Sequence, residues 1–161
     1  MKKFCFAIVA IAILAVGCAN RAPSLTAITV EDFSDILGRE WRLLEVHVND
    51  TFGRTILFDR NTLMQEGDGD IFTMKFDEEM VSGTAAPNLY SGPFTLGEGN
   101  SLSIGMMRST LMATLFEPER LPEHEFFGYM TNVHEWQFVD GRLVLLSKTE
   151  DDRDVEMIFG L

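Results

Sequence analysis

The chain has 161 residues, of which 25 are acidic, 13 are basic and 46% are apolar. This length fits one domain, and the apolar fraction is sufficient for a packed core. The formal net charge of -12 argues against binding to nucleic acid or electrostatic attraction to anionic lipid headgroups, because both need clustered Lys and Arg. Two cysteines are too few for a disulfide scaffold or a four-cysteine zinc site.

The N-terminus has the pattern of a secretion signal. Lys2 and Lys3 precede an uncharged apolar run over residues 4–16, which as a helix would span roughly 20 Å, well short of a bilayer core of about 30 Å. The run ends in Leu14-Ala15-Val16-Gly17-Cys18, which resembles the lipobox of bacterial lipoproteins. In such proteins the cysteine is lipidated and becomes the mature N-terminus. The alternative is an ordinary secreted protein in which Cys18 is incidental.

We therefore divide the chain into a lipoprotein signal peptide (residues 1–17), a lipidated N-terminus and tether (residues 18–28) and a folded domain (residues 29–161). The mature protein would keep 11 basic and 25 acidic residues, a formal charge of -14. Its folded domain would contain no cysteine. The resemblance implies attachment to a membrane through lipid on Cys18, facing the periplasm. Ala19 in place of an inner-membrane retention Asp favours the outer membrane.

The first predicted elements are a short helix and a long strand. Thr29 and Asp32 have the spacing of a helix start, and Gly38 is a suitable C-terminal cap. Apolar and polar residues alternate over residues 39–48, as in a strand, and the alternation shifts by one residue after Leu43. A β-bulge is therefore expected near Leu43.

Short strands and one helix make up the rest of the chain. Strands are predicted over residues 55–58, 71–76, 80–84, 92–96 and 102–104, separated by turns rich in Gly, Asp and Asn. A helix is expected within residues 117–133, with Pro118 or Pro122 in its first turn. A hairpin turning at Asp140-Gly141 and a last strand over residues 155–159 follow. The predicted fold class is α+β and mostly antiparallel β, a small barrel or curved sheet with one packed helix and a short N-terminal helix.

Four ordered stretches resemble the META/HslJ domain family. They are Leu37-Gly38-Arg39-Glu40-Trp41-Arg42-Leu43, the segment Val81-Ser82-Gly83 with Asn88-Leu89-Tyr90-Ser91-Gly92, Ile104 with Thr110-Leu111-Met112-Ala113, and the apolar helix with Leu143-Val144-Leu145. The resemblance implies a compact β-rich domain with a helix, found in envelope lipoproteins and linked to stress or antibiotic tolerance. The family offers no established catalytic residues to transfer.

The chain departs from the family pattern in two ways. Pro87 and Thr114 stand where family members have cysteines, which argues against carrying over a redox or metal role. A longer insert over residues 54–70 predicts an extra hairpin.

The polar candidates for chemistry are better explained as structural or solvated residues. His47, His124 and His134 lack the spacing of a zinc site, and the acidic loop over residues 66–70 lacks the calcium-loop pattern. The sequence also has no nucleophile elbow and no phosphate-binding loop. We therefore expect no catalytic residues, no metal and no cofactor, and a protein that is not an enzyme.

Methionines and tyrosines provide the remaining candidates. Met106, Met107 and Met112 could bind soft copper, but core packing is favoured. Tyr90, Arg108 and Tyr129 are the candidate interaction surface, because tyrosine combines an apolar ring with a polar tip.

The leading hypothesis is a non-enzymatic envelope lipoprotein that binds another envelope component and no nucleic acid. The alternative is a small-ligand-binding β-barrel whose pocket is lined by Trp, Phe and Met. A cavity of about 300 Å³ or more with a few inward polar groups would favour the alternative, and a filled interior would argue against it.

Overall fold

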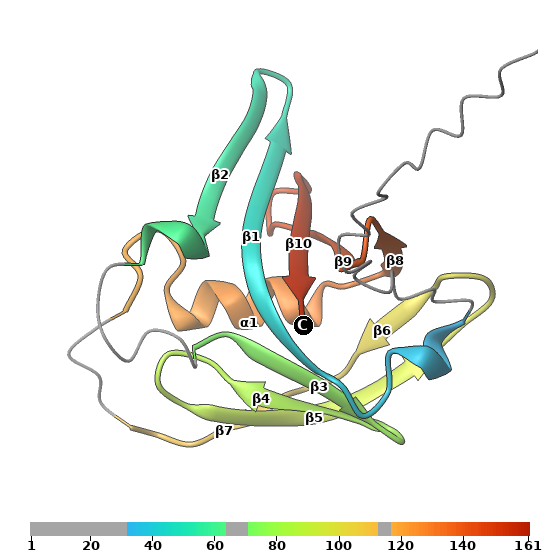
Figure 1. Ribbon diagram of the computed structural model, residues 1–161. Helices are drawn as coiled ribbons and strands as arrows, with labels where there is room; N and C mark the ends of the chain where they lie inside the picture. Colours follow the sequence, from blue (N-terminus) through green and yellow to red (C-terminus); the bar gives the residue numbers. More distant parts are fainter. Residues whose placement is uncertain (1–31, 64–70, 113–116) are drawn as a thin grey trace, which may run out of the picture.

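The computed structural model describes residues 32–63, 71–112 and 117–161, and its strands join in one antiparallel sheet (Figure 1). The strands are β1 (Glu40–Asp50), β2 (Gly53–Asp59), β3 (Thr73–Asp77), β4 (Met80–Thr84), β5 (Leu89–Leu96), β6 (Leu102–Ile104), β7 (Arg108–Ser109), β8 (Glu135–Val139), β9 (Arg142–Lys148) and β10 (Asp154–Gly160). Their order is β6-β5-β4-β3-β1-β10-β9-β8, with β2 added beside β1 and β7 beside β5. A bridge between Ser101 and Glu135 brings the two ends of this order together. The predicted fold class, a mostly antiparallel barrel-like sheet with one helix, is confirmed.

Strand β1 links the two halves of the sheet. Its first residues pair with β3, its last residues pair with β2, and β10 runs along its other edge. The pairing with β10 shifts register between Leu43 and Glu45, so the predicted bulge near Leu43 is confirmed. Leu44, the extra residue, packs over Gly160, where an added Cβ would lie 2.9 Å from Leu44 Cδ1.

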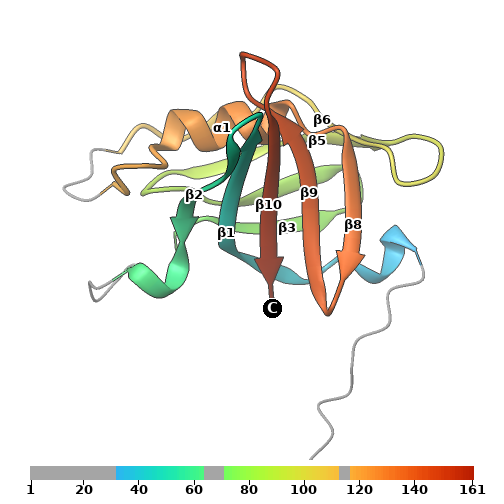
Figure 2. The same cartoon turned by 90° about the horizontal axis from the view of Figure 1, so that it is seen from above.

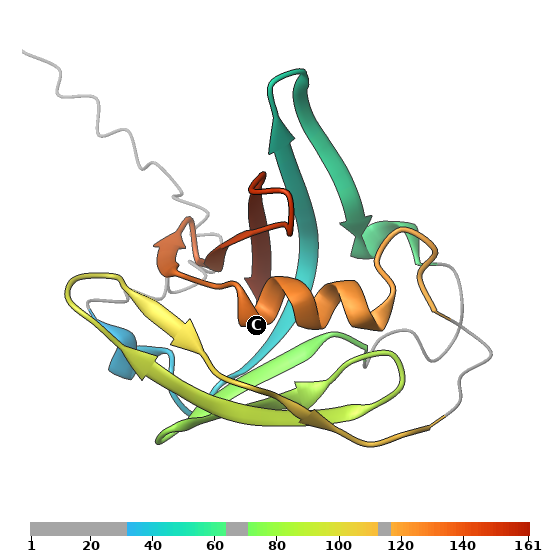
Figure 3. The same ribbon diagram turned by 180° about the vertical axis from the view of Figure 1, so that it is seen from behind.

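The helix α1 (Glu123–Thr131) is shorter than the segment in which it was predicted. Pro122 occupies the N-cap with φ near -65° rather than the first turn, and the helix ends at Asn132. Figure 3 shows α1 lying between the C-terminal strands and strands β3 to β5. Phe126 and Met130 on its inner face are fully buried.

The N-terminal helix is a single 3-10 turn, η1 (Phe33–Asp35). Asp32 caps it by accepting the Ser34 N–H at 2.7 Å, while Asp35 accepts the Asp32 N–H at 3.5 Å. The start predicted at Thr29 lies outside the described residues. Phe33 in this turn is buried, with its ring 5.0 Å from that of Phe76 on β3 and 5.3 Å from that of Trp136 on β8.

Several predicted strand boundaries are confirmed and others shift. The strands over residues 80–84 and 102–104 occur as predicted, and the turn at Asp140-Gly141 has positive φ at both residues, as a two-residue hairpin requires. β5 begins earlier than predicted, at Leu89, and β7 was not predicted. Of the predicted insert, β2 and the 3-10 turn η2 (Arg60–Thr62) are described, and residues 64–70, including the acidic loop, lie outside the described part.

Figure 2 shows the sheet and α1 from above. Aromatic and aliphatic side chains pack between them. Five large side chains at the centre have no exposed surface: Trp41, Phe72, Phe76, Phe126 and Phe159. Neighbouring rings touch one another, with Phe72 and Phe126 4.8 Å apart between ring centroids. The Trp, Phe and Met side chains of the described interior therefore pack against each other rather than line a ligand pocket.

Candidate functional site

The segment from Gly83 to Tyr90 builds a buried junction between strands. A Cβ added at Gly83 would lie 2.0 Å from the carbonyl oxygen of Thr73, so only glycine fits there. Tyr90 is 3% exposed, and its hydroxyl donates a hydrogen bond of 2.8 Å to the same Thr73 carbonyl. Burial raises the pKa of the Tyr90 hydroxyl above its ordinary value. The exposure predicted for Tyr90 is therefore wrong, because its strand position faces the core and the core supplies a partner for its polar tip.

Asn88 is the centre of a hydrogen-bond network that was not predicted from the sequence. Its side-chain amide donates to Glu123 Oε2 at 2.8 Å, and its backbone N–H donates to Glu123 Oε1 at 3.2 Å. Its side-chain oxygen accepts from the Thr110 hydroxyl at 2.9 Å and from the Met112 N–H at 2.7 Å. Asn88 thus ties the segment after β7 to the first turn of α1. Its position in the family motif Asn88-Leu89-Tyr90-Ser91-Gly92 is the sequence feature that could have indicated this role.

An exposed, largely apolar surface lies along β5 and β7, at the lower side of the view in Figure 1. It consists of Leu89, Met106, Arg108, Leu111 and Met112, which we call the β5–β7 surface. Met106 is 87% exposed and Leu111 is 99% exposed. Thr110 holds the two strands in place by donating its N–H to the Leu89 carbonyl at 3.0 Å.

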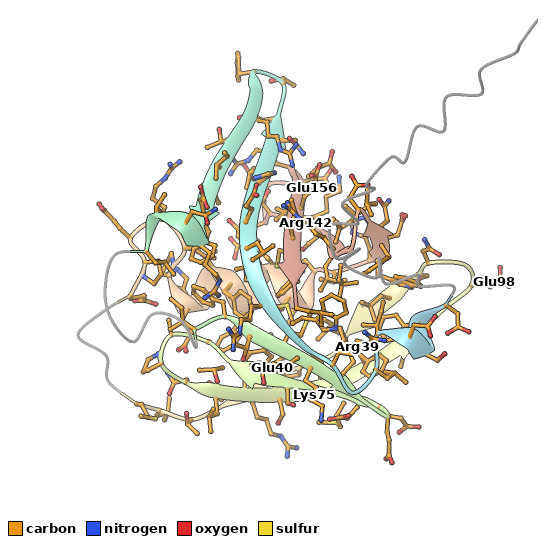
Figure 4. All side chains as sticks on the ribbon, viewed as in Figure 1. Arg39, Glu40, Lys75, Glu98, Arg142 and Glu156 are labelled. Carbon is orange, nitrogen blue, oxygen red and sulfur yellow. The ribbon has the colours of Figure 1, made fainter. Side chains whose placement is uncertain are left out.

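This part of the chain carries almost no charge. Residues 80–112 contain only two charged side chains, Glu98 and Arg108, in a chain with 25 acidic residues. Figure 4 places Glu98 at the far loop, away from Glu40 and Lys75, which lie beside each other on β1 and β3. The β5–β7 surface is therefore an uncharged or weakly basic area on a strongly acidic protein.

The three methionines predicted to pack in the core differ in burial. Met107 is half-buried and packs on β5, where a Cβ added at Gly92 would lie 2.9 Å from Met107 Cγ. Met106 and Met112 are exposed, so the prediction that they pack in the core is wrong. Met106, Met107 and Phe127 line a groove of about 250 Å³ between β7 and α1.

A polar pocket of about 370 Å³ lies beside α1, and we call it the α1 pocket. One wall is a face of the helix and the other is the end of β9 with the loop to β10. The helix contributes His124, Glu125, Gly128, Tyr129 and Asn132, and the other wall contributes Lys148, Thr149, Glu150, Asp151 and Arg153.

Tyr129 and Glu125 form the fixed polar group of the helix wall. The Tyr129 hydroxyl donates a hydrogen bond of 2.6 Å to Glu125 Oε2, and the tyrosine is 6% exposed. Burial, and then this bond to a carboxylate, raises the pKa of Tyr129, so the phenol stays protonated. The exposure predicted for Tyr129 is wrong. Arg108 lies on β7 and Tyr90 in the core, so the three predicted residues do not form one surface.

The opposite wall is a loop held by its own hydrogen bonds. The Thr149 hydroxyl donates to Asp151 at 2.6 Å and accepts the Arg153 N–H at 2.9 Å. Arg153 Nε in turn lies 2.9 Å from Asp151 Oδ2. These contacts lower the pKa of Asp151, chiefly through the Thr149 hydroxyl, and raise that of Arg153. The loop is therefore ordered without any ligand.

The histidines do not converge. His47 is buried on β1 with its Nε2 2.7 Å from a Glu45 carboxylate oxygen, whereas His124 and His134 are exposed. Within the described ranges, no group of three or more His, Cys, Asp or Glu side chains is arranged to hold a metal ion. In the same part of the chain, no helix has the length and apolar character needed to cross a bilayer.

A second polar network covers the outer side of the C-terminal strands. Figure 4 shows Arg142 and Glu156 on this side, and Arg54 Nη2 on β2 lies 2.7 Å from Glu156 Oε2. Arg142 Nη1 lies 3.6 Å from Glu45 Oε1. The pairs are partly exposed, and each reaches across one intervening strand, β1 for Arg54–Glu156 and β10 for Arg142–Glu45.

Comparison with known proteins identifies the family. The model of the META domain matches residues 34–157. A protein from Burkholderia xenovorans, solved by NMR, is similar in fold with a TM-score of 0.54 and 16% identity over 87% of this chain and 97% of that one. A DUF4847 family protein from Bacteroides vulgatus, in a crystal structure, has a TM-score of 0.53 and 14% identity over 80% of this chain and 95% of that one. No curated protein matches the chain. The family match covers most of the chain and coincides with the described barrel, so the chain belongs to the META domain family.

Proposed function

We propose that this META domain protein is a lipid-anchored, non-enzymatic module of the cell envelope that binds a partner protein through the β5–β7 surface. The observation that carries the proposal is that surface. Exposed apolar side chains gather there, and residues 80–112, which supply this surface, include a single acidic residue, Glu98. Contiguous exposed apolar areas mark interaction sites, because contact of apolar side chains with water is unfavourable and binding a partner removes it.

The surface is also preformed. Asn88 and Thr110 hold residues 110–112 against β5 and the first turn of α1. A partner would therefore meet Leu111 and Met112 already in position, and association would lose little conformational entropy. Methionine adds adaptable contacts, since its unbranched side chain fits partners of different shape.

The partner we expect is a protein with an apolar patch and acidic groups near it. Arg108 is the only basic residue between residues 80 and 112, and it is exposed on β7 next to Ser91. An anionic lipid surface fits less well, because a domain with a formal charge of -14 after signal removal would be repelled by it.

The alternative, a ligand held inside the barrel, has less support. The interior positions that would line such a pocket are occupied by large side chains with no exposed surface, among them Trp41, Phe76 and Phe126. Hollows larger than about 300 Å³ do occur, among them the polar α1 pocket, but they are open at the surface and are not lined by these core side chains.

The anchor is tested by replacing Cys18 with Ala. Because the proposed lipid attaches to that thiol, Cys18→Ala should leave the signal peptide uncleaved and the protein without fatty acid. Metabolic labelling with a clickable fatty acid should therefore label only the parent. If Cys18→Ala protein still partitions with membranes and carries lipid, the anchoring proposal is wrong.

The surface is tested by site-specific photo-crosslinking in cells. A photoreactive amino acid at Met106 or at Leu111 should yield the same adduct with one envelope protein, whereas the same amino acid at exposed Val139 on β8 should not. Leu89→Glu should abolish the adduct, because it places a charge in the apolar surface, and Thr95→Glu is the matched control on the same strand. Adducts that differ between positions 106 and 111, or that survive Leu89→Glu, would contradict the proposal.

A further inference from the structure

A glycine in the middle of α1 keeps the α1 pocket open. Gly128 is the sixth residue of a nine-residue helix, and a Cβ added there would meet no atom within 4 Å. Glycine inside a helix is less stable than alanine, and packing does not require it at this position. The missing side chain leaves space beside the helix, because Gly128 lines the α1 pocket and also the groove next to Met106 and Met107.

Both walls of the α1 pocket are fixed before anything binds. On the helix, Glu125 is held by the Tyr129 hydroxyl through Oε2, which leaves Oε1 free of any bond among the described residues. On the loop, Thr149 and Asp151 form the hydrogen bonds described above. A pocket with ordered walls and an unused acceptor is preorganised for a ligand that donates hydrogen bonds.

The basic groups of the pocket are already neutralised. Lys148 Nζ lies 2.8 Å from Asp154 Oδ1, and Arg153 binds Asp151 through Nε. These pairs raise the pKa of Lys148, chiefly through the bond to Asp154, so the ammonium remains charged and engaged. Each of these two cations therefore already has a carboxylate partner, although Arg153 keeps its Nη groups as donors.

The acidic groups of the pocket are not neutralised. Glu125 contacts only the neutral hydroxyl of Tyr129, and Glu150 has no ion pair within the described part of the chain. Asn132 uses its amide N–H₂ to bind the Lys148 carbonyl at 3.1 Å, which leaves its side-chain oxygen as a further acceptor. Glu125, Glu150 and the Asn132 side-chain oxygen are thus acceptors that remain open to a ligand.

We propose that the α1 pocket binds a small organic cation that carries a primary ammonium or guanidinium group. The cationic group would donate to Glu125 Oε1 and to the Asn132 side-chain oxygen, with Glu150 at the rim adding attraction. The volume of about 370 Å³ suits a ligand of metabolite size. None of these ligand contacts belongs to the β5–β7 surface, although Gly128 also lines the groove beside Met106.

The test is a titration of ¹⁵N-labelled mature protein, in neutral detergent, with 1,4-diaminobutane. Saturable shifts are expected at the amides of Gly128, Tyr129 and Thr149. Glu125→Gln should weaken binding at least tenfold, because it removes the charge and keeps the shape. Glu98→Gln, which removes the same charge from the distant β5–β6 loop, is the matched control and should change binding less than twofold.

A second variant tests the pocket itself. Gly128→Leu should fill the space and abolish the shifts, while the thermal midpoint of unfolding stays at or above that of the parent, since no atom lies near the new Cβ. Equal weakening by Glu98→Gln would show a nonspecific response of an acidic surface. Tighter binding of sodium acetate or phosphate than of the diamine would also overturn the proposal. Crosslinks from positions 106 and 111 should be unaffected by Glu125→Gln and Glu98→Gln, which separates this test from that of the proposed partner surface. Gly128→Leu is left out of this comparison because residue 128 also lines the groove beside Met106.

Discussion

At the scale of single residues, Asn88 connects two segments that are far apart along the chain. This one buried residue donates two hydrogen bonds to Glu123 and accepts two more, from the Thr110 hydroxyl and the Met112 N–H. Because Asn88 is 5% exposed, water cannot replace these bonds if the side chain is lost. The stability of the domain and the order of the β5–β7 surface are thus linked through one amide.

We predict that Asn88→Ala lowers the free energy of unfolding by about 2–3 kcal/mol, because it removes the amide donor to Glu123 Oε2 and the acceptor of the Thr110 hydroxyl and the Met112 N–H. The backbone bond from residue 88 to Glu123 Oε1 remains. Urea denaturation of parent and variant measures the change. Asn100→Ala, at an exposed turn, is the control and should change the free energy by less than about 0.5 kcal/mol. A similar small change in Asn88→Ala would show that the network contributes little.

At the scale of elements, the β9–β10 loop is stabilised by carboxylates whose pKa values are lowered. Asp151 is bound by Thr149 and Arg153, and Asp154 is bound by Lys148. A carboxyl whose pKa is lower in the folded than in the unfolded state stabilises the fold above its unfolded pKa of about 3.9. That contribution disappears as the pH falls further and the folded carboxyl takes up a proton.

We therefore expect the urea midpoint to fall as the pH is lowered below about 4. Asp151→Asn should make this fall shallower, since its carboxyl no longer takes part in the titration. Asp140→Asn, an equal change of charge in the exposed β8–β9 turn, is the comparison. Parallel pH profiles for the parent and both variants would mean that the loop carboxylate does not contribute.

At the scale of the whole molecule, one core joins both halves of the sheet. Trp41 on β1 contacts Phe138, and Trp136 on β8 contacts Phe33, with ring centroids 6.2 Å and 5.3 Å apart. Both tryptophans belong to the same cluster of buried residues. The near-closure of the barrel by β6 and β8 leaves no boundary at which the halves could separate without exposing this core.

We predict a single cooperative unfolding transition, in which tryptophan fluorescence and far-ultraviolet circular dichroism have the same urea midpoint. Trp136→Phe leaves Trp41 as the reporter of the first strand, and Trp41→Phe leaves Trp136 as the reporter of β8. The midpoint from fluorescence should match that from circular dichroism within each variant. Distinct midpoints would show that the two halves unfold separately.

Several features could be predicted because their signals are local. Alternating side chains predict strands such as β4 and β6, the Asp140-Gly141 pair favours a two-residue turn, and the change of phase after Leu43 indicates a bulge. The resemblance to the family, carried by its motifs, predicts that these strands form a barrel-like sheet. Boundaries such as the start of β5 and the end of α1 were less well predicted, because partner strands and the core decide where pairing and burial stop.

The sequence by itself determined the fold class, the family and the charge of this protein, since periodicity, turn residues and composition are properties of neighbouring residues. Only the tertiary structure decided which side chains are exposed. Tyr90 and Tyr129 are buried because the core and Glu125 supply partners for their hydroxyls, while Met106 and Leu111 remain outside. Whether a residue lies in a pocket, a core or a surface depends on contacts between segments that are distant in sequence, and those contacts exist only once the barrel has formed.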